Sequence, residues 1–446
     1  SDLLADLGIP YTTPYDEQNI QKADPDLVVV ANALSRGNVE VESMLAQEIP
    51  YTSFPELLGD CFLKDRQTIV VSGTHGKTTT TSAMAHILEQ TGQQPGFLIG
   101  GIPHDFKRSF RVGTGKAFAI EGDEYDTAFF DKNSKFHHYH PQFLIVNNLE
   151  FDHADIFDSI DDIYREFEKL LKNMGEPRHI IANVDNPGVA TLLHRIGLTD
   201  HVTQVATEGK DSGAQYQRGE IATRTDPDKG AIWSTTINGC ESFGDITFET
   251  HLVGVHNLAN VAMIVACLDR MNQAGALDKP MTQEGLTTSI GSFRGVKRRM
   301  ESLGQVNGID VFEDFAHHPT AVDTVIAGFR RSFPDRRLVV AFEPRSASQR
   351  RNVFSQAFAQ ALAKADEVLI GECPLDTRIP ESERMNTAQL KSQIGHHATA
   401  FPTNPALLEA LVQKALPGDA IIFMSSGSFS GVQHQVVDAL KQRVNS

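Results

Sequence analysis

The chain is poor in cysteine, has no long hydrophobic run and carries no excess of positive charge. Only four of its 446 residues are cysteines, and no two of them form a Cys-x-x-Cys pair. Neither a disulfide framework nor a zinc ribbon is therefore indicated, and a reducing, cytoplasmic compartment is expected. No apolar run approaches the roughly 20 residues of a membrane-spanning helix, so the sequence predicts no membrane segment.

The charge balance bears on the kind of partner. The formal net charge is −17. Nonspecific binding to nucleic acid depends on a basic face that neutralises phosphates, so we expect no nucleic-acid partner. A small anionic ligand stays compatible with this charge, because its affinity follows the local field around a site.

The length predicts more than one domain. We expect three, at residues 1–63, 64–292 and 293–446, and strands that alternate with helices predict mostly parallel sheets covered on both faces. The first domain is expected to be a partial nucleotide-binding unit. A complete doubly wound domain would begin with a strand and a glycine-rich turn, and neither precedes the run that starts at Leu27.

Secondary structure is expected where apolar residues recur with strand or helix periodicity. Strands are expected at Leu27–Ala31, Thr68–Val71, Phe97–Ile99, Phe118–Ile120, Phe143–Val146, Ile180–Ala182, Val311–Phe312, Leu338–Phe342, Val368–Ile370 and Ala420–Met424. Helices are expected at Ser43–Gln47, Pro55–Leu63, Thr79–Gln90, Asp158–Asn173, His256–Met271, Thr320–Arg330, Val353–Lys364, Ala406–Ala415 and Val432–Val444. Residues 207–249, rich in glycine, threonine and aspartate, are expected to form a β excursion with loops.

A phosphate-binding loop is the strongest local signal. The run Gly-Thr-His-Gly-Lys-Thr at residues 73–78 lies between an expected strand and an expected helix, which is the context such a loop needs. Its glycines let backbone N–H groups approach phosphate oxygens, and the helix N-terminus adds its positive dipole end. Lys77 can reach the β- and γ-phosphates, and Thr78 can ligate Mg²⁺. Val71 stands where the usual pattern has a glycine, and an ordinary strand-to-helix turn is the alternative.

Two acidic runs follow expected strands. Glu121-Gly122-Asp123-Glu124 comes after the strand that ends at Ile120, and the run from Asn147 to His153 comes after the next strand. Ligands of α/β proteins bind at the carboxyl ends of strands, and Mg²⁺ on ATP needs one or two carboxylate oxygens. A magnesium site is therefore favoured over a solvated acidic turn for the first run. His153 alone is more typical of a structural histidine.

Three later motifs complete the pattern. Asn257 and Asn260 are three residues apart at a helix start, so they share a face that can contact a nucleotide; helix capping is the alternative. The basic triplet that ends at Arg299 can supply planar donors to phosphoryl charge, although such triplets are usually solvated. The run Glu313–Pro319 places carboxylates and two histidines between a strand and a helix.

In this order the motifs resemble those of the Mur ligase family of bacterial cell-wall synthesis. The series is Gly-Thr-His-Gly-Lys-Thr, Glu-x-Asp-Glu, Asp-His, His-Asn-x-x-Asn, Arg-Arg and Asp-x-x-His-His-Pro, and the resemblance runs from about Asp26 to the C-terminus. The family has a short form of the loop, which accounts for Val71. The resemblance implies an α/β fold with a Rossmann-like N-terminal domain, here shortened, a central P-loop ATPase domain and a C-terminal Rossmann-like domain.

The resemblance also implies a reaction. Within the family the likeness is strongest to the murein peptide ligases, through the runs Asn32–Asn38, Tyr125–Lys132, Asn148–His153 and Phe342–Ser346. These enzymes join UDP-N-acetylmuramate to the tripeptide L-alanyl-γ-D-glutamyl-meso-diaminopimelate, through an acyl phosphate made with ATP, in peptidoglycan recycling. Addition of L-alanine to the same sugar nucleotide is the alternative. A folyl-polyglutamate-type ligase and a non-catalytic nucleotide-binding protein are less favoured.

Residue roles follow by likeness. The catalytic set implied is Lys77, Arg299, Asp314 and, as a base for the amine, His317. ATP contacts are implied for Gly73, Thr74, His75, Gly76, Lys77, Thr78, Thr79, Asn257, Asn260 and Arg299. Mg²⁺ ligands are implied to be Thr78, Glu121 and His153. Since the loop lies in the second domain and Asp314 in the third, the catalytic set predicts domain closure; the sequence leaves the oligomeric state open.

Overall fold

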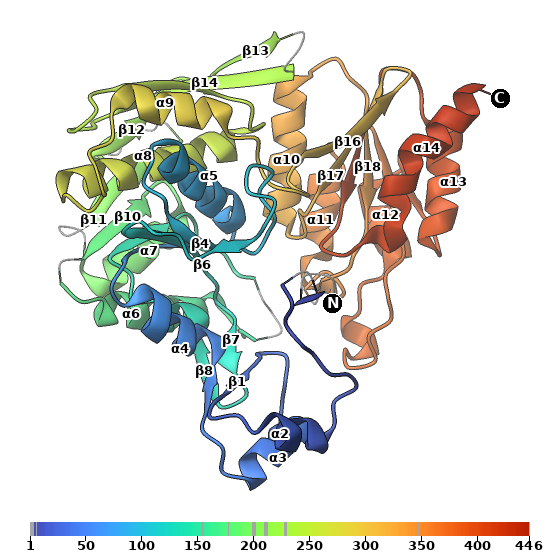
Figure 1. Ribbon diagram of the computed structural model, residues 1–446. Coiled ribbons are helices and arrows are strands. Elements are labelled where there is room, and N and C mark those ends of the chain that lie inside the picture. Colours follow the sequence, from blue (N-terminus) through green and yellow to red (C-terminus); the bar gives the residue numbers. More distant parts are fainter. Residues whose placement is uncertain are drawn as a thin grey trace.

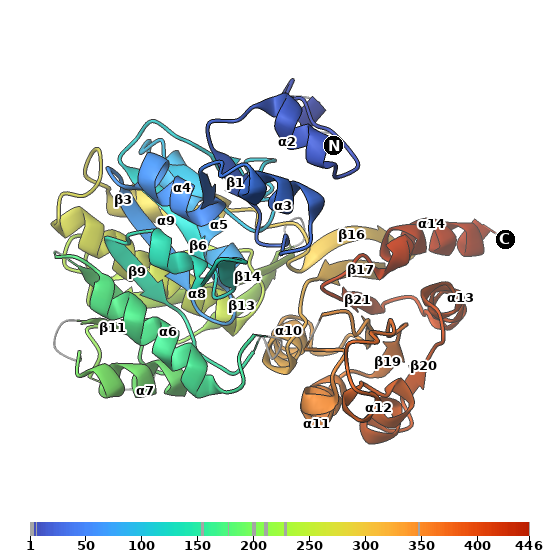
Figure 2. The ribbon, with the colours of Figure 1, turned by 90° about the horizontal axis from the view of Figure 1, so that it is seen from below.

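Two α/β lobes and a small N-terminal part make up the molecule, as the ribbon in Figure 1 shows. The structure, a computed structural model, describes residues 4–445 apart from 6, 153–155, 177, 199–201, 209–212, 227–229 and 347. The central lobe carries the phosphate loop, between β3 and α5. The C-terminal lobe lies beside the central lobe, as Figure 1 and the view from below in Figure 2 both show. Within the described part of the chain, no helix is long and apolar enough to cross a membrane.

The N-terminal part is small and packs on the central lobe. It contains α2 (Glu17–Ala23), β1 (Val28–Val30), α3 (Val39–Ala46), β2 (Tyr51–Ser53), α4 (Phe54–Leu58) and the π-turn η1 (Gly59–Leu63). Strands β1 and β2 pair in parallel. Its core is formed by Val30, Val41 and Met44, against which Phe129 and Phe130 pack. These two rings flank the turn of a hairpin, β7 (Asp126–Ala128) and β8 (Asp131–Ser134), that extends from the central lobe.

The central lobe is built on one large sheet. Its strand order is β13-β14-β12-β11-β10-β9-β3-β6-β4-β5, with β15 on β14. The bounds are β3 (Gln67–Ser72), β4 (Gly96–Leu98), β5 (Phe110–Arg111), β6 (Ala117–Gly122), β9 (Phe143–Val146), β10 (His179–Asn183), β11 (Val202–Ala206), β12 (Tyr216–Arg218), β13 (Ala222–Asp226), β14 (Gly230–Asn238) and β15 (Ile246–Thr250). The middle strands are parallel, whereas β12 to β15 pair with one another in antiparallel fashion; the sequence predicted a β excursion at residues 207–249 but not the direction of its strands.

Helices cover both faces of the central sheet because successive strand residues point to opposite sides. On β3, Ile69 and Val71 join the core beneath α5 (Lys77–Gln90), α8 (Val255–Gln273) and α9 (Gln283–Ser292). Val70, between them, joins the opposite core beneath α6 (Ile160–Asn173) and α7 (Pro187–Ile196). Burial on both faces explains why these strands are continuous apolar runs in the sequence.

The C-terminal lobe repeats this plan on a smaller scale. Its sheet has the order β16-β17-β21-β18-β19-β20. The strands are β16 (Glu301–Val306), β17 (Ile309–Asp314), β18 (Leu338–Phe342), β19 (Glu367–Ile370), β20 (Ala398–Ala400) and β21 (Ala420–Met424). One face packs on α10 (Pro319–Ser332), α11 (Ser355–Leu362) and α12 (Thr387–Ile394), the other on α13 (Asn404–Lys414) and α14 (Val432–Asn445).

Contacts outside the site also join the two lobes, and two of them involve named polar groups. The chain between α9 and β16 is fixed to the central lobe, where Arg294 Nε lies 2.6 Å from Asp105 Oδ1 and Val296 pairs with Pro103. Farther along, the indole N–H of buried Trp233 in β14 donates to Ser332 Oγ at the end of α10, at 3.1 Å. The neighbouring Arg331 guanidinium lies 5.5 Å from the centre of the Trp233 ring.

Candidate active site

A large cavity lies between the carboxyl ends of the two sheets. Its volume is about 910 Å³, and its lining comes from the segments that follow β3, β6, β9 and β10 in the central lobe and β17, β18 and β21 in the C-terminal lobe. Strand ends of this kind are where open α/β sheets bind ligands. The predicted phosphate loop, Arg299, Asp314 and His317 all line this cavity.

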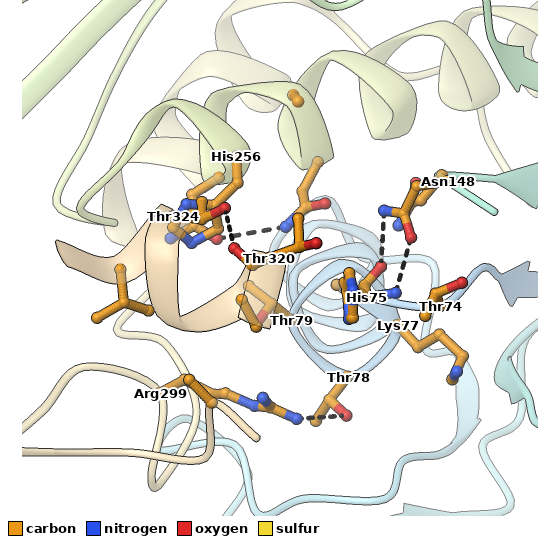
Figure 3. Close-up of a pocket in the computed structure, with 18 of the residues that line it drawn as sticks. Thr74, His75, Lys77, Thr78, Thr79, Asn148, His256, Arg299, Thr320 and Thr324 are labelled. Carbon is orange, nitrogen blue, oxygen red and sulfur yellow. Dashed lines mark hydrogen bonds between the residues drawn. The ribbon is translucent and has the colours of Figure 1, made fainter. Parts of the chain in front are cut away.

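The loop at 73–78 has the backbone shape of a phosphate cradle. Gly73 and Gly76 have φ of 133° and 83°, and an added Cβ would lie 2.8 Å from the Asn148 carbonyl and 2.7 Å from Asn260 Oδ1 respectively. The Asn148 side chain brackets His75: its Oδ1 accepts from the His75 N–H at 2.7 Å, and its Nδ2 donates to the His75 carbonyl at 3.1 Å (Figure 3). Helix α5 starts after Gly76 with no side-chain cap, so its first N–H groups are left for an anion.

Lys77 is held at the cavity by two acceptors. Its Nζ donates to the Gly73 carbonyl and to Glu124 Oε2, both at 2.7 Å. Burial lowers the pKa of Lys77, but the carboxylates of Glu124 and Asp123 outweigh burial and raise it above the usual value. The ammonium is therefore charged at neutral pH and suited to a phosphate.

The structure describes two of the three predicted magnesium ligands, Thr78 and Glu121. Thr78 Oγ1 donates to Glu121 Oε2 at 3.1 Å, and Glu121 Oε1 accepts from the Gly100 N–H at 2.6 Å. Burial raises the pKa of Glu121. A hydroxyl and a buried carboxylate are oxygen donors that a hard divalent cation prefers, and such a cation would offset the cost of burying the charge, so these two residues fit Mg²⁺. His153, the third predicted ligand, lies outside the described residues.

The C-terminal lobe brings a cation to the same place. Arg299 Nη2 donates to Thr78 Oγ1 at 3.5 Å, as Figure 3 shows, and its guanidinium lies 4.9 Å from the centre of the Phe315 ring. Burial lowers the pKa of Arg299. Asp314 accepts from the N–H groups of Met300 and Ala316, at 2.8 and 2.7 Å. The Asp314 carboxylate thus fixes the backbone on either side of the strand end, directly beside Arg299.

His317 lies in the cavity wall as a neutral imidazole. Its Nδ1 lies 3.0 Å from the Phe315 carbonyl oxygen, so this nitrogen carries the proton and donates. Burial lowers the pKa of His317 to about 4. The free lone pair is on Nε2, which is the nitrogen that could accept a proton from an amine.

The two asparagines of α8 lie behind the phosphate loop. Asn260 Nδ2 donates to Asn257 Oδ1 at 3.3 Å, and Asn257 Nδ2 donates to the Val253 carbonyl at 2.8 Å. Both line the cavity together with Thr74 and Thr79 of the predicted nucleotide set. The bond from Asn257 is to a carbonyl in the preceding loop, so simple capping of α8 does not account for its position.

Three polar groups of the site were not assigned from the sequence. Glu124 is the partner of Lys77, although the acidic run drew attention to its region. Glu150 accepts from Thr320 Oγ1 at 2.6 Å, a bond between the lobes, and lies near two histidines. Burial raises the pKa of Glu150, but the close contact with His75, the hydrogen bond from Thr320 and the charge of His318 outweigh burial and lower this pKa to about 2. Nothing in the local sequence singles out Thr320.

Comparison with known families agrees with this geometry. Residues 71–268 match the Mur ligase middle domain, and residues 298–427 match the Mur ligase, glutamate ligase domain. The first match contains the phosphate loop, Glu121 and the asparagine pair, and the second contains Arg299, Asp314 and His317.

Individual relatives align over nearly the whole chain. A UDP-N-acetylmuramate–L-alanyl-γ-D-glutamyl-meso-2,6-diaminoheptandioate ligase of Escherichia coli K12 is 36% identical, over 100% of this chain and 91% of its own length. A UDP-N-acetylmuramate–L-alanine ligase of Desulfitobacterium hafniense Y51 is 30% identical, over 95% and 88%. The crystal structure of a murein peptide ligase from Psychrobacter arcticus 273-4 superposes with a TM-score of 0.68 at 31% identity, over 99% of this chain and 91% of that one.

These matches confirm the three-domain α/β architecture and the amide-forming, ATP-dependent ligase class predicted from the motifs. The phosphate loop, the two matched domains and a full-length identity above 30% are consistent with one another. The chain belongs to the Mur ligase family.

Proposed function

We propose that this enzyme joins UDP-N-acetylmuramate to the tripeptide L-alanyl-γ-D-glutamyl-meso-diaminopimelate in peptidoglycan recycling. The choice of the tripeptide as the amine substrate rests on sequence identity over nearly the whole chain. This identity is 36% to a ligase named for the tripeptide and 30% to a ligase named for L-alanine. The Psychrobacter arcticus neighbour is likewise named a murein peptide ligase.

The cavity supports activation of a carboxylate by ATP. The lactyl carboxylate of the muramyl group attacks the γ-phosphate and gives an acyl phosphate, and the peptide amine then attacks that carbonyl and expels phosphate. Lys77 and the open N-terminus of α5 take the phosphates, and Arg299 meets the transferring group from the other lobe. Binding of phosphate to Lys77 replaces its contact with Glu124.

Mg²⁺ fits the same site. Thr78, Glu121 and His153 are the proposed ligands, and the ion neutralises phosphoryl charge when bound. Asp314, at the end of β17, positions the segment before β16 that carries Arg299 through its bond to the Met300 N–H, and it also accepts from the Ala316 N–H. His317 Nε2 takes the amine proton.

The remaining assignments follow from the same reaction. Residues 1–63 contribute to the UDP-sugar site, residues 64–292 bind ATP, and residues 293–446 supply the amine side of the cavity. The substrates are a sugar nucleotide, ATP and a recycled peptide, so we place the enzyme in the cytoplasm.

An amide-formation assay tests this function. The purified protein is given ATP, Mg²⁺ and UDP-N-acetylmuramate, with the tripeptide in one reaction and L-alanine in another, and the product mass is measured. We expect ADP release and a product only when both the sugar nucleotide and the tripeptide are present. Lys77→Met serves as the inactive control.

Two results would contradict the proposal in different ways. A product with L-alanine and none with the tripeptide would assign the chain to the other branch of the family. Phosphate release that needs neither the sugar nucleotide nor the amine substrate would show that the enzyme hydrolyses ATP without ligation.

A further inference from the structure

A cluster of two histidines and a glutamate lies at the boundary between the lobes. His75 belongs to the phosphate loop, Glu150 follows β9, and His318 stands at the start of α10. One potential ligand atom of each residue lies within 4.8 Å of the other two. None of the roles proposed for the ligase reaction uses these three side chains together.

The distances are close to those of a metal site. His75 Nε2 lies 3.6 Å from Glu150 Oε2, and His318 Nδ1 lies 3.8 Å from the same oxygen. Ligand atoms placed 2.0–2.1 Å from a tetrahedral zinc ion are roughly 3.3 Å apart. To accept an ion, the two contacts through Glu150 need to shorten by a few tenths of an ångström, and the two imidazole nitrogens, which lie within 4.8 Å of each other, need to approach as well.

Each of the two imidazoles has a ring nitrogen that makes no hydrogen bond to the described residues. Neither His75 Nε2 nor His318 Nε2 has a hydrogen-bond partner among the described residues, although both atoms are buried. His318 is 5% exposed, and its Nδ1 accepts only a long bond, 3.4 Å, from the Thr320 N–H. The rings of the two histidines lie 4.7 Å apart, so both converge on Glu150.

We infer that His75, Glu150 and His318 form a binding site for a transition-metal ion of the zinc type, which bridges the two lobes. Two imidazoles and one carboxylate suit Zn²⁺ and Co²⁺, whereas Mg²⁺ prefers oxygen ligands alone. Three protein ligands leave the fourth position for a water molecule or an oxygen of a bound substrate.

The bridge joins elements that otherwise touch through few groups. His75 and Glu150 are in the central lobe, and His318 is in the C-terminal lobe, next to Thr320, whose hydroxyl donates to Glu150. An ion held by all three therefore stabilises the closed arrangement of the lobes and leaves the open one unaffected. The alternative is that Glu150 simply balances two histidines by charge, with no ion.

Zinc binding to the whole protein separates these two accounts. The protein is stripped with a chelator and titrated with Zn²⁺ by calorimetry, without ATP, Mg²⁺ or sugar nucleotide, and Co²⁺ replaces Zn²⁺ for visible spectroscopy. We expect one site per chain and the d–d absorption of tetrahedral Co²⁺. Glu150→Gln and His318→Asn should each raise the Zn²⁺ dissociation constant at least tenfold.

The variants are chosen to keep the fold. Asparagine is a strong N-cap residue, so His318→Asn retains a cap for α10 while it removes the imidazole. His396→Asn, at an exposed histidine elsewhere in the C-terminal lobe, is the control for binding to surface histidines and should leave the titration unchanged. Circular dichroism of each variant checks that it is folded.

A second measurement does not depend on the variants. Bound Zn²⁺ should raise the midpoint of thermal unfolding of the unmodified protein, because a ligand that binds only the folded state stabilises it. Absence of saturable Zn²⁺ binding, or binding that Glu150→Gln and His318→Asn leave intact, would overturn the proposal. None of these outcomes bears on amide formation, so the test stands apart from that of the ligase reaction.

Discussion

Helices α5 and α10 both begin at the cavity, but they begin differently. Helix α5 follows Gly76, which has φ of 83° and offers no side-chain acceptor to the first N–H groups. Helix α10 follows His318, whose Nδ1 accepts from the Thr320 N–H, and Pro319 then fills a position that needs no N–H. One helix end is open to an anion, and the other is closed by its own side chain.

The difference divides the work between the lobes. The open end, with Lys77 beside it, is a place for phosphate, and its charges are balanced within the central lobe by Glu124 and Glu121. The closed end offers fewer free N–H groups to an anion, and the C-terminal lobe reaches the phosphate loop through the Arg299 side chain. Two sheets of the same type thus contribute different chemistry because of how one helix in each begins.

The strongest way to break this comparison is to remove the cation at the open end. Lys77→Met should lower kcat/KM by roughly 10³-fold, since it removes a donor to developing phosphoryl charge. Initial rates of ADP release in the complete reaction measure the effect. Lys116→Met, at an exposed lysine just before β6 and at the opposite end of the strands from the loop, should keep the unmodified rate; an equal loss there would refute a specific role for Lys77.

A smaller effect is expected when the open end is narrowed. Gly76→Ala adds a Cβ 2.7 Å from Asn260 Oδ1 in a left-handed conformation, so ATP affinity should fall roughly tenfold or more. Gly275→Ala is the matched control, because Gly275 also has positive φ, of 62°, but nothing lies near its added Cβ. It should cost about 1–2 kcal/mol of stability and leave nucleotide binding intact. Equal ATP affinity in both variants would refute the cradle.

Acid stability extends the comparison to the body of the central lobe. Burial raises the pKa of Glu166, but hydrogen bonds from His137, Lys169 and the Ser134 N–H outweigh burial and lower this pKa to about 2. Because the folded pKa is below the unfolded value of 4.5, the carboxylate stabilises the fold above pH 4.5, and this is lost as the pH falls toward 2.

Glu166→Gln should therefore reduce stability at pH 7 by on the order of 1–3 kcal/mol, and the difference should vanish near pH 2. Denaturant unfolding at a series of pH values measures it. Glu220→Gln, at an exposed glutamate, should show no such trend. A constant difference at every pH would mean that packing, and not charge, explains the effect.

The smallest effect is expected at the contact between the start of α10 and the segment that follows β9. Thr320→Val removes the bond to Glu150 and should cost about 1 kcal/mol of stability, with a modest rise in KM. Thr287→Val removes a bond of the same kind within α9, to the Gln283 carbonyl, at a residue that does not line the cavity, and should leave KM unchanged. A shift in KM in both variants would mean that the loss of a helical hydroxyl, and not of the contact with Glu150, explains the effect.

Much of the fold could be predicted because buried strands are legible in sequence. The strands expected at Phe143–Val146, Leu338–Phe342 and Ala420–Met424 have those bounds in the structure, since burial on both faces makes each a continuous apolar run. Helix α9 was not predicted. Its two glycines and its threonines hide the apolar spacing, and Leu286 and Ile290 alone anchor it in the core.

The site was predictable where it is contiguous and not where it is assembled by the fold. The phosphate loop is one run of residues, and its geometry follows from its glycines. The acidic run gave no means of telling Glu121 from Glu124, which only the structure assigns to Thr78 and to Lys77. The bond between Glu150 and Thr320 joins positions 170 residues apart, and no periodicity connects them.

The contact of β14 with the end of α10 has an optical consequence. Trp233 is the single tryptophan of the chain, and it is buried with its indole N–H on Ser332 and the Arg331 guanidinium over its ring. Separation of the lobes would wet this indole and shift its fluorescence to longer wavelength. The single tryptophan of the enzyme thus lies at the junction, and its fluorescence can follow opening and closing in real time without a label.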